Sequence, residues 1–331
     1  MSAPVVVTFG EMLLRLSPPP YETFLESPGF TANFGGCEAN VGVALARLGV
    51  RPAYVTVLPD NPVGDAAMAS LREAGVDTSG IVRATGRMGV YFVELGRGER
   101  ATRVVYDRAG SAFATASAEL FRSSPLPQGA AWLHGSGITP ALSVEANATM
   151  TRALAAARSA RVPVSIDLNY RPALWTDKDP KSVGVHVRGA DLLIGNARAC
   201  REMLGVDASD EVTAAPNGAH ALARDIAQQF GARRVALTRR EMPSEERHLW
   251  SASLYDADTG SFAMSRVHDV HVVDRVGGGD AFAAALIACL LRGEPSERAV
   301  EYAAAAGALK LAVPGDFATF THDDITRAVA G

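Results

Sequence analysis

The feature that most constrains the fold is a regular alternation of short apolar runs with helical patterns after Ala116. The helical patterns lie near residues 144–159, 197–204 and 217–230, where apolar residues recur at helical spacing. The strand-like runs between them are Ala131–His134, Val162–Asp167, Asp191–Ile194 and Arg234–Thr238. This order predicts an α/β fold, with a central, mostly parallel sheet and helices on both faces.

The segments that follow these strands are expected to form one site, because ligands of parallel sheets bind beyond the carboxyl ends of the strands. These segments are Gly135–Gly137, Asp167–Arg171, Gly195–Asn196 and Gly277–Asp280. They carry glycine, amide, acidic and basic groups. We therefore expect a polar cleft at that edge of the sheet.

The first third of the chain combines the same α/β pattern with a second, smaller sheet. The α/β part consists of strands Val5–Phe9 and Tyr54–Leu58 and helices Cys37–Leu48 and Asp65–Ala74. Four further strand-like runs predict a small antiparallel sheet carried on insertions: Met12–Leu16, Phe30–Phe34, Gly89–Leu95 and Ala101–Tyr106. Near the C-terminus we expect strands at Leu249–Tyr255 and Phe262–Val267, and a long helix from Ser296 to about Ala312.

A run of three glycines, Gly277, Gly278 and Gly279, separates a strand end from an apolar helix that continues to Leu291. Without Cβ atoms, backbone N–H groups can converge on one point, and a helix N-terminus favours an anion there. Asp280 stands in the first turn, where a carboxylate can take a proton from an attacking hydroxyl. A tight turn with a capping aspartate is the structural alternative.

Composition excludes several classes of function. A net charge of −4 and the absence of a basic run argue against nucleic-acid binding. The longest apolar run, Ala281–Leu291, is too short to span a membrane, and no signal peptide is recognisable, so we expect a cytoplasmic protein. Cys37, Cys200 and Cys289 are too few and too far apart for a disulfide framework or a metal cluster.

Lysine occurs only at Lys178, Lys181 and Lys310, and no Gly-Lys-Ser/Thr phosphate loop exists. A lyase that forms a Schiff base through a buried lysine has almost no candidate nucleophile. Any phosphate chemistry would therefore depend on backbone N–H groups, arginine and metal.

Two signatures together resemble the ribokinase-like (PfkB) family of sugar kinases: Gly35-Gly36-Cys37-Glu38-Ala39-Asn40 and Asp274 to Asp280. The resemblance covers essentially the whole chain. It implies a single kinase domain over residues 1–331, with lid segments at about 11–34 and 88–110. It also implies ATP and Mg²⁺ as cofactors, Asp280 as the general base, and an anion hole at Gly277, Gly278 and Gly279.

Within the family the chain is most similar to 2-keto-3-deoxygluconate kinases. Phe9–Pro18, Tyr106–Ala112, Asp167–Trp175, Thr238–Glu241 and Pro314–Phe317 carry this similarity. The resemblance implies that the sugar acid is bound by Gly35, Gly36, Asn40, Tyr91, Tyr106, Arg108, Arg171 and Asp316. It implies a nucleotide site at Asn196, Thr238, Arg240, Gly277 and Gly279.

Arg15 separates two substrate classes. Fructokinases resemble this chain at Gly10-Glu11 but carry an aspartate at the position of Arg15, which serves sugar hydroxyls. An arginine there, together with Arg108 and Arg171, suits an anionic substrate, because guanidinium holds a carboxylate through two hydrogen bonds. A neutral-sugar kinase such as a fructokinase is the alternative. A sugar-sensing protein is a third hypothesis, disfavoured because a sensor has no need of Asp280 and an anion hole.

Some residues depart from the family pattern or have a structural interpretation. Where the family often has Asn-x-x-Glu, this chain has Asn196-Ala197-Arg198-Ala199, so the metal ligands stay unassigned and the nearest acid is Glu202. Tyr91 and Tyr106 are equally typical of a cross-strand aromatic pair, Asp316 of a turn, and His134 of a buried structural histidine. The small sheets of this family often pair across a dimer, and Leu14, Phe30 and Phe92 would permit a homo-oligomer of this kind.

Overall fold

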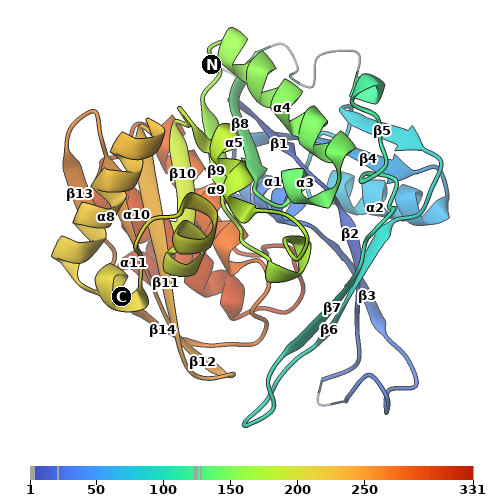
Figure 1. Cartoon of the computed structure of the whole chain (residues 1–331). Coiled ribbons are helices and arrows are strands. Elements are labelled where there is room, and N and C mark those ends of the chain that lie inside the picture. The colour runs from blue at the N-terminus through green and yellow to red at the C-terminus, as the bar shows by residue number, and fades with distance from the viewer. Residues whose placement is uncertain (1–3, 21, 122–125, 127–128, 331) are drawn as a thin grey trace.

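The computed structural model describes residues 4–20, 22–121, 126 and 129–330 (Figure 1). Its centre is a large sheet with strand order β13-β12-β11-β10-β9-β8-β1-β4-β5, and β14 also pairs with β12. The strands are β1 (Val5–Phe9), β4 (Arg51–Pro59), β5 (Ile81–Ala84), β8 (Ala130–Ser136), β9 (Val164–Asp167), β10 (Leu192–Asn196), β11 (Arg234–Ser244), β12 (Arg247–Asp256), β13 (Ser261–Met264) and β14 (His268–His271).

Every pairing from β5 across to β11 is parallel, and the pairings of β12 with β11, β13 and β14 are antiparallel. The prediction of a mostly parallel sheet is therefore confirmed. β11 continues to Ser244, beyond the predicted end at Thr238, because β12 folds back along it as a hairpin. Apart from Met242 and Pro243 the extra residues are polar, and most of them are exposed, so the apolar pattern did not include them.

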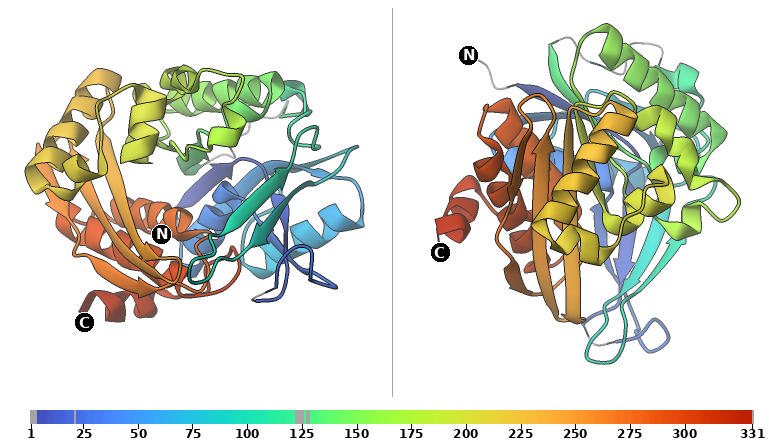
Figure 2. Two further views of the ribbon diagram at one scale, coloured as in Figure 1. Left: turned by 60° about the horizontal axis from the view of Figure 1, so that its bottom comes forward. Right: turned by 60° about the vertical axis from the view of Figure 1, so that its left-hand side comes forward.

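Helices cover both faces of this sheet (Figures 1 and 2). Val6 packs in the hydrophobic core that includes α1, α9 and α10, whereas its neighbour Val7 packs in the core that includes α4 and α8. The α-helices are α1 (Cys37–Arg47), α2 (Pro62–Glu73), α3 (Thr139–Leu142), α4 (Val144–Ser159), α5 (Gly184–Val187), α6 (Ala197–Ala199), α7 (Asp210–Ala214), α8 (Pro216–Phe230), α9 (Gly278–Leu291), α10 (Ser296–Leu311) and α11 (His322–Ala330).

The short helices α3, α5 and α7 were not predicted, and two longer helices also differ from the prediction. α2 begins at Pro62 rather than Asp65, because the Asn61 side chain accepts hydrogen bonds from the N–H groups of Val63 and Gly64 and so caps the helix. α11 was not predicted, although Ile325, Ala328 and Val329 stand at helical spacing and pack in one hydrophobic cluster. No helix in the described ranges is long and apolar enough to cross a membrane.

The small sheet has strand order β3-β2-β6-β7 and projects from the large one (Figure 2). Its strands are β2 (Leu13–Ser17), β3 (Thr31–Gly35), β6 (Gly89–Glu94) and β7 (Arg103–Asp107). The expected antiparallel sheet is wrong in one pairing, since β2 and β6 are parallel. β2 follows β1 and β6 follows β5, and both preceding strands belong to the parallel set, so the chain leaves the large sheet twice in the same direction.

Candidate functional site

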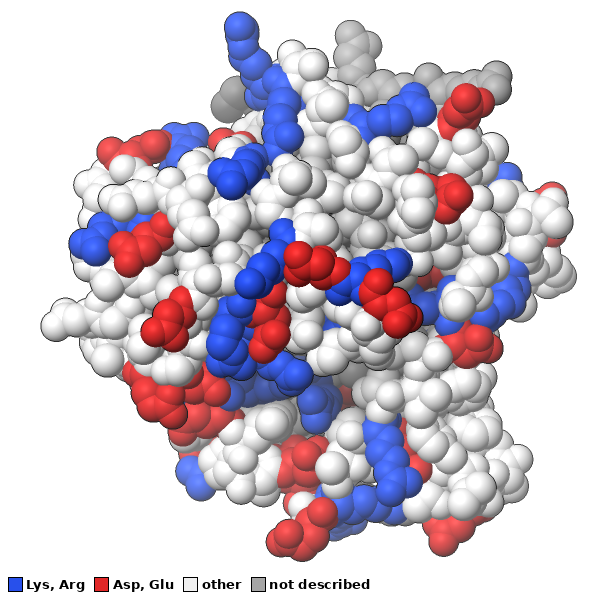
Figure 3. Space-filling model, viewed as in Figure 1, with Lys and Arg blue, Asp and Glu red and all other residues white. Residues whose placement is uncertain are grey.

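A cleft of about 610 Å³ lies between the small sheet and the carboxyl ends of the parallel strands. Figure 3 shows lysine and arginine side chains gathered about the hollow on this face. Nearly all residues named from the sequence line the cleft: Gly36, Asn40, Tyr91, Tyr106, Arg108, Arg171, Asn196, Thr238, Arg240, Gly277, Gly278, Gly279, Asp280 and Asp316. Three of the four segments expected to converge here do line the cleft, whereas Gly135–Gly137 does not and only the following Ile138 reaches it.

Gly35 is the exception among the predicted site residues. It is buried at the end of β3 and is not part of the cleft lining. A Cβ on Gly35 would collide with the carboxylate of Asp316. The absence of a side chain here lets Asp316 approach the strand, so Gly35 affects the site through the position of Asp316.

The glycine run forms the N-terminus of α9. Gly277 has φ 85°, a left-handed conformation that glycine adopts without a Cβ penalty, and the helix begins at Gly278. Gly278 packs against Leu311, whereas a Cβ on Gly279 would meet nothing within 4 Å. The first N–H groups of a helix have no partner within it, so they are available to an anion at this open side.

Asp280 lies in the first turn of α9 and accepts a hydrogen bond of 2.6 Å from the Asn40 side-chain amide. Burial, with smaller contributions from Asp167 and Glu38, raises the pKa of Asp280 to about 7, although the Asn40 hydrogen bond and Arg171 oppose the shift. A carboxyl with a pKa near neutrality can accept a proton at working pH and release it again. Asp280 therefore has the properties of a general base.

Asp167 is a second acid at the cleft, to which the sequence assigned no role of its own. It ends β9 and accepts a hydrogen bond of 3.0 Å from the N–H of Asn169. Burial raises its pKa to about 6, with a further contribution from Glu38. The signal that could have identified it is its place directly after a buried parallel strand.

The arginines correct the sequence-based argument for an anionic substrate. Arg15 is 2% exposed and does not line the cleft; its guanidinium bonds Asp274 at 2.7 Å and Asp316 at 3.0 Å. Arg108 does line the cleft, but its Nε and Nη2 donate to one carboxylate oxygen of Glu11 at 2.8 and 2.5 Å. Both charges are balanced within the protein, so Arg15 cannot support the argument and Arg108 supports it less.

Arg171 is different, because no ion pair to it is found among the described residues. Its Nη1 donates to the carbonyl oxygen of Tyr170 at 3.3 Å, and the side chain is exposed at the cleft. The walls of the cleft remove part of the surrounding water, which by itself would lower the pKa of Arg171, but the nearby ionisable groups, led by Tyr106, raise it. This guanidinium is available to an incoming anion.

Tyr91 and Tyr106 form the cross-strand aromatic pair that was the structural interpretation of these residues. They pair across β6 and β7 with ring centroids 5.7 Å apart and an interplanar angle of 22°, and both line the cleft. The Tyr91 hydroxyl donates to Asp316, and the Arg108 guanidinium lies 5.7 Å from the centre of the Tyr106 ring. The aromatic pair thus forms the wall that the small sheet presents to the cleft.

Another part of the cleft lining comes from Asn196, the last residue of β10, and from Thr238 and Arg240 within β11. The Asn196 side-chain oxygen accepts the N–H of Ala199 at 2.9 Å and so caps α6. Burial and the neighbouring cations Arg275 and Arg171 lower the pKa of Arg240 to about 10. This accumulation of positive charge suits a polyanion such as a nucleotide phosphate.

The described residues contain no group of three or more His, Cys, Asp or Glu placed to hold a metal ion. Mg²⁺ seldom needs such a cage, since it usually keeps several waters and takes one or two carboxylates together with substrate phosphates. Asp167 and Asp280 supply carboxylates on the cleft, whereas Glu202 does not line it. The donor set therefore fits Mg²⁺ that arrives with a phosphate ligand.

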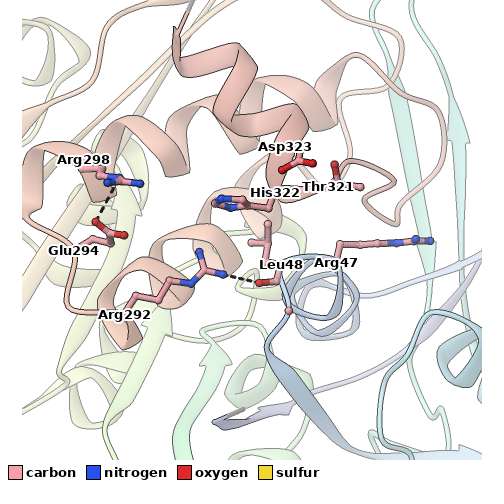
Figure 4. A pocket seen from close by; sticks show the side chains of 9 residues that line it. Arg47, Leu48, Arg292, Glu294, Arg298, Thr321, His322 and Asp323 are labelled. Carbon is pink, nitrogen blue, oxygen red and sulfur yellow. Dashed lines mark hydrogen bonds and ion pairs between the residues drawn. The ribbon is translucent and has the colours of Figure 1, made fainter. Parts of the chain in front are cut away.

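A second hollow of about 590 Å³ lies elsewhere on the surface (Figure 4). Its arginines are mostly engaged: Arg292 donates to the carbonyl oxygen of Leu48 at 2.6 Å, and Arg298 pairs with Glu294 at 3.4 Å. Its one glycine, Gly49, lies in the turn after α1 rather than at the start of a helix, and neither of its acids, Glu294 and Asp323, is buried. The chemistry is concentrated in the cleft at the strand ends.

The comparisons with known proteins agree with this geometry. The model of the pfkB family carbohydrate kinases matches residues 4–321. The 2-dehydro-3-deoxygalactonokinase of Haloferax volcanii is 35% identical over 327 residues, which are 98% of this chain and 96% of that protein. The crystal structure of 2-dehydro-3-deoxygluconokinase from Thermotoga maritima has a TM-score of 0.94 at 39% identity and covers 99% of this chain and 100% of its own.

A more distant structure shares the fold. It is a putative Ribokinase II from E. coli in complex with ATP and Mg²⁺, with a TM-score of 0.79 at 21% identity and 99% coverage of both chains.

Proposed function

The chain belongs to the pfkB family of carbohydrate kinases, and on that premise we propose that it phosphorylates 2-keto-3-deoxygluconate (2-dehydro-3-deoxygluconate) with ATP, giving 2-keto-3-deoxy-6-phosphogluconate. The observation that carries the proposal is the position of Asp280. A carboxylate with a pKa of about 7 stands beside an open helix N-terminus and shares its cleft with the guanidinium of Arg171, which has no ion-pair partner among the described residues. Base, anion site and cation are what transfer to a sugar acid requires.

In the proposed reaction, Asp280 accepts the proton of the substrate's terminal hydroxyl as the hydroxyl oxygen attacks the γ-phosphorus in line. The bond from that phosphorus to the β,γ-bridging oxygen breaks, and ADP leaves. The N–H groups at Gly278 and Gly279 stabilise the negative charge on the transferring phosphoryl oxygens. Mg²⁺, when bound through Asp167 and the phosphates, would neutralise further charge on the nucleotide.

The sugar acid would lie between the glycine turn and the small sheet. Arg171 is proposed to bind its carboxylate or the adjacent oxygens, and Tyr106 to cover it. Asp316 has one oxygen near Tyr91 and the other near Arg15, so it is held as a fixed acceptor for a sugar hydroxyl. Arg108 would contribute if Glu11 shared its guanidinium with the substrate. Gly36 and Asn40 would complete the pocket floor: Gly36, whose φ is 146°, by close backbone approach and Asn40 through its amide.

The nucleotide would occupy the other end, near Asn196, Thr238 and Arg240. The positive charge of Arg240 and Arg275 suits its phosphates. The small sheet would act as a lid over both ligands. A homo-oligomer formed through the lid and a cytoplasmic location remain predictions.

The galactonate epimer is a second candidate substrate, because the 35% identical relative is named for it. The two acids share the carboxylate and keto group and differ in the orientation of a hydroxyl. Arg171 would bind both alike. Discrimination would have to come from hydroxyl acceptors such as Asp316.

The test is an assay that couples ADP release to NADH oxidation on a panel of 2-keto-3-deoxygluconate, its galactonate epimer, fructose, ribose and gluconate. We expect the highest kcat/KM on one or both keto-deoxy acids. A higher kcat/KM on fructose would replace the proposal with a fructokinase. Ligand binding without ADP release would support a sensor.

A further inference from the structure

Beneath the glycine turn lies a cluster of four buried charged side chains: Arg15, Asp274, Lys310 and Asp316. Lys310, near the end of α10, is 0% exposed, although lysine is rarely fully buried. Two cations and two anions balance within the cluster. Buried charges are tolerated only when each one is paired and hydrogen-bonded, so the groups that bond these four side chains are held in defined positions.

The Lys310 ammonium bonds backbone rather than acid. Nζ donates to the carbonyl oxygen of Gly315 at 2.7 Å and to that of Val313 at 3.3 Å. Both belong to the short loop after α10 that ends in Asp316, a residue of the cleft. Lys310 therefore ties this loop to the helix from which it emerges.

The same loop is joined to the segment before the glycine turn. Asp274 Oδ2 accepts the N–H of Gly315 at 3.1 Å, while Oδ1 accepts the N–H of Val276 at 3.0 Å. The turn itself rests on Lys310, since a Cβ on Gly277 would lie 3.1 Å from Lys310 Cε and 2.7 Å from the carbonyl oxygen of Asp316. A shift of the loop would thus move both Asp316 and the glycine turn.

We infer that Lys310 is a positioning residue for phosphoryl transfer, whose ammonium holds the loop at 313–316 so that the glycine turn keeps the geometry of an anion hole. Lys310 touches neither substrate; it acts through Gly315 and Gly277. Its effect should therefore fall on the transition state, where the N–H groups of the turn must meet the transferring phosphoryl group. The binding of ATP itself uses the wider nucleotide site and should change little.

The test compares wild type with Lys310→Met, which keeps the length of the side chain without its charge, and Lys310→Ala. The control is Lys181→Ala, an exposed lysine away from the cleft. Two hydrogen bonds from a charged donor are lost, so we expect Lys310→Met to lower kcat by about 10- to 100-fold while KM for ATP changes by less than about threefold. Lys181→Ala should match wild type.

Chemical rescue separates positioning from a general structural role. Lys310→Ala removes the atoms that n-propylammonium contains, so propylammonium chloride should restore part of kcat, whereas equal ionic strength of sodium chloride should not. Melting temperatures of all variants are measured in parallel. A kcat within threefold of wild type for Lys310→Met would overturn the inference, and so would unfolding of both variants without any rescue by propylammonium.

The assay uses whichever sugar of the panel wild type phosphorylates fastest. The inference rests on sugar phosphorylation, but not on the identity of the sugar. If fructose were the better substrate, the proposed substrate would fail while the Lys310 test would still give a result.

Discussion

The pKa of Asp280 predicts how the rate depends on pH. With a pKa of about 7, Asp280 is roughly 90% ionised at pH 8 and roughly 10% at pH 6, so kcat/KM should fall about tenfold between these values. The measurement is the coupled assay with Mg·ATP saturating and the sugar acid varied, in buffers of constant ionic strength. An ordinary aspartate, with a pKa near 4, would give a constant rate over this range.

Two variants test whether the inflection of the pH–rate profile arises from Asp280. Asn40→Ala removes the 2.6 Å hydrogen bond that stabilises the ionised form of Asp280, so the inflection should move to higher pH. Asp167→Asn removes a neighbouring like charge and should move it to lower pH, whatever its effect on the maximum rate. A profile that is flat from pH 6 to 8, or an inflection that neither variant moves, would refute the assignment of Asp280 as the base.

Asp280→Asn adds a second readout, because the folded-state pKa is raised above the value in an unfolded chain. Between about pH 4 and pH 7 the folded protein then binds a proton that the unfolded chain has lost, so the contribution of Asp280 to stability falls as pH rises through this window. A neutral asparagine avoids this loss. Asp280→Asn should therefore melt at a higher temperature than wild type at pH 8, but not at pH 4, while kcat falls by about 10²–10⁴-fold. Near-normal turnover would remove Asp280 from the mechanism.

Three further predictions concern one residue of the cleft and two contacts near it. Arg171→Ala should lower kcat/KM for the keto-deoxy acid by about 10- to 100-fold and Arg171→Lys by less, with little change on fructose; equal losses on both substrates would contradict the sugar-acid reading. Arg15→Met removes the ion-pair partner of two buried carboxylates and should lower the free energy of unfolding, measured by urea denaturation, by about 3–5 kcal/mol. The control is Arg247→Met in an exposed ion pair, which should lower it by at most about 1 kcal/mol. Similar losses in the two variants would show that burial of the pair does not matter here. ATP hydrolysis without sugar should be negligible in wild type. Glu245→Gln weakens the contact with Thr102, so the rate of sugar-free ATP hydrolysis should rise relative to the rate of sugar phosphorylation. An unchanged ratio of the two rates would argue that the lid does not close at this contact.

Much of the fold could be predicted because the apolar periodicity and the glycine-rich breaks indicate the same element boundaries. The glycine run and the apolar stretch after it located α9 to within a residue or so, and a strictly buried pattern located β1. The parallel pairing of β2 with β6 could not be predicted, since each strand carries a similar alternation and only the path between the sheets sets its direction. α11 could have been predicted, since Ile325, Ala328 and Val329 recur at helical spacing, but the pattern extends over only nine residues.

The positions of the site residues could be predicted from the sequence, but the ion-pair partners of its arginines could not. A sequence does not show which acid each arginine meets, and three arginines looked equivalent. The structure separates them: Arg15 is buried between Asp274 and Asp316, Arg108 bonds Glu11, and Arg171 has no ion-pair partner in the described part of the chain. Only contacts between segments far apart in the chain decide this.

The contacts of the small sheet differ in strength from its base to its tip. At the base, Arg15 on β2 and Tyr91 on β6 both bond Asp316, in surroundings that exclude water. At the tip, Thr102 donates to Glu245 across the cleft at 2.7 Å, a partly exposed contact worth about 1 kcal/mol or less. The base must hold for the glycine turn to keep its shape, whereas the tip can release at little cost. Opening of the lid should therefore occur beyond Tyr91, by separation of the β6–β7 hairpin from the β11–β12 hairpin, and leave Asp316 and the anion site in place for the next substrate.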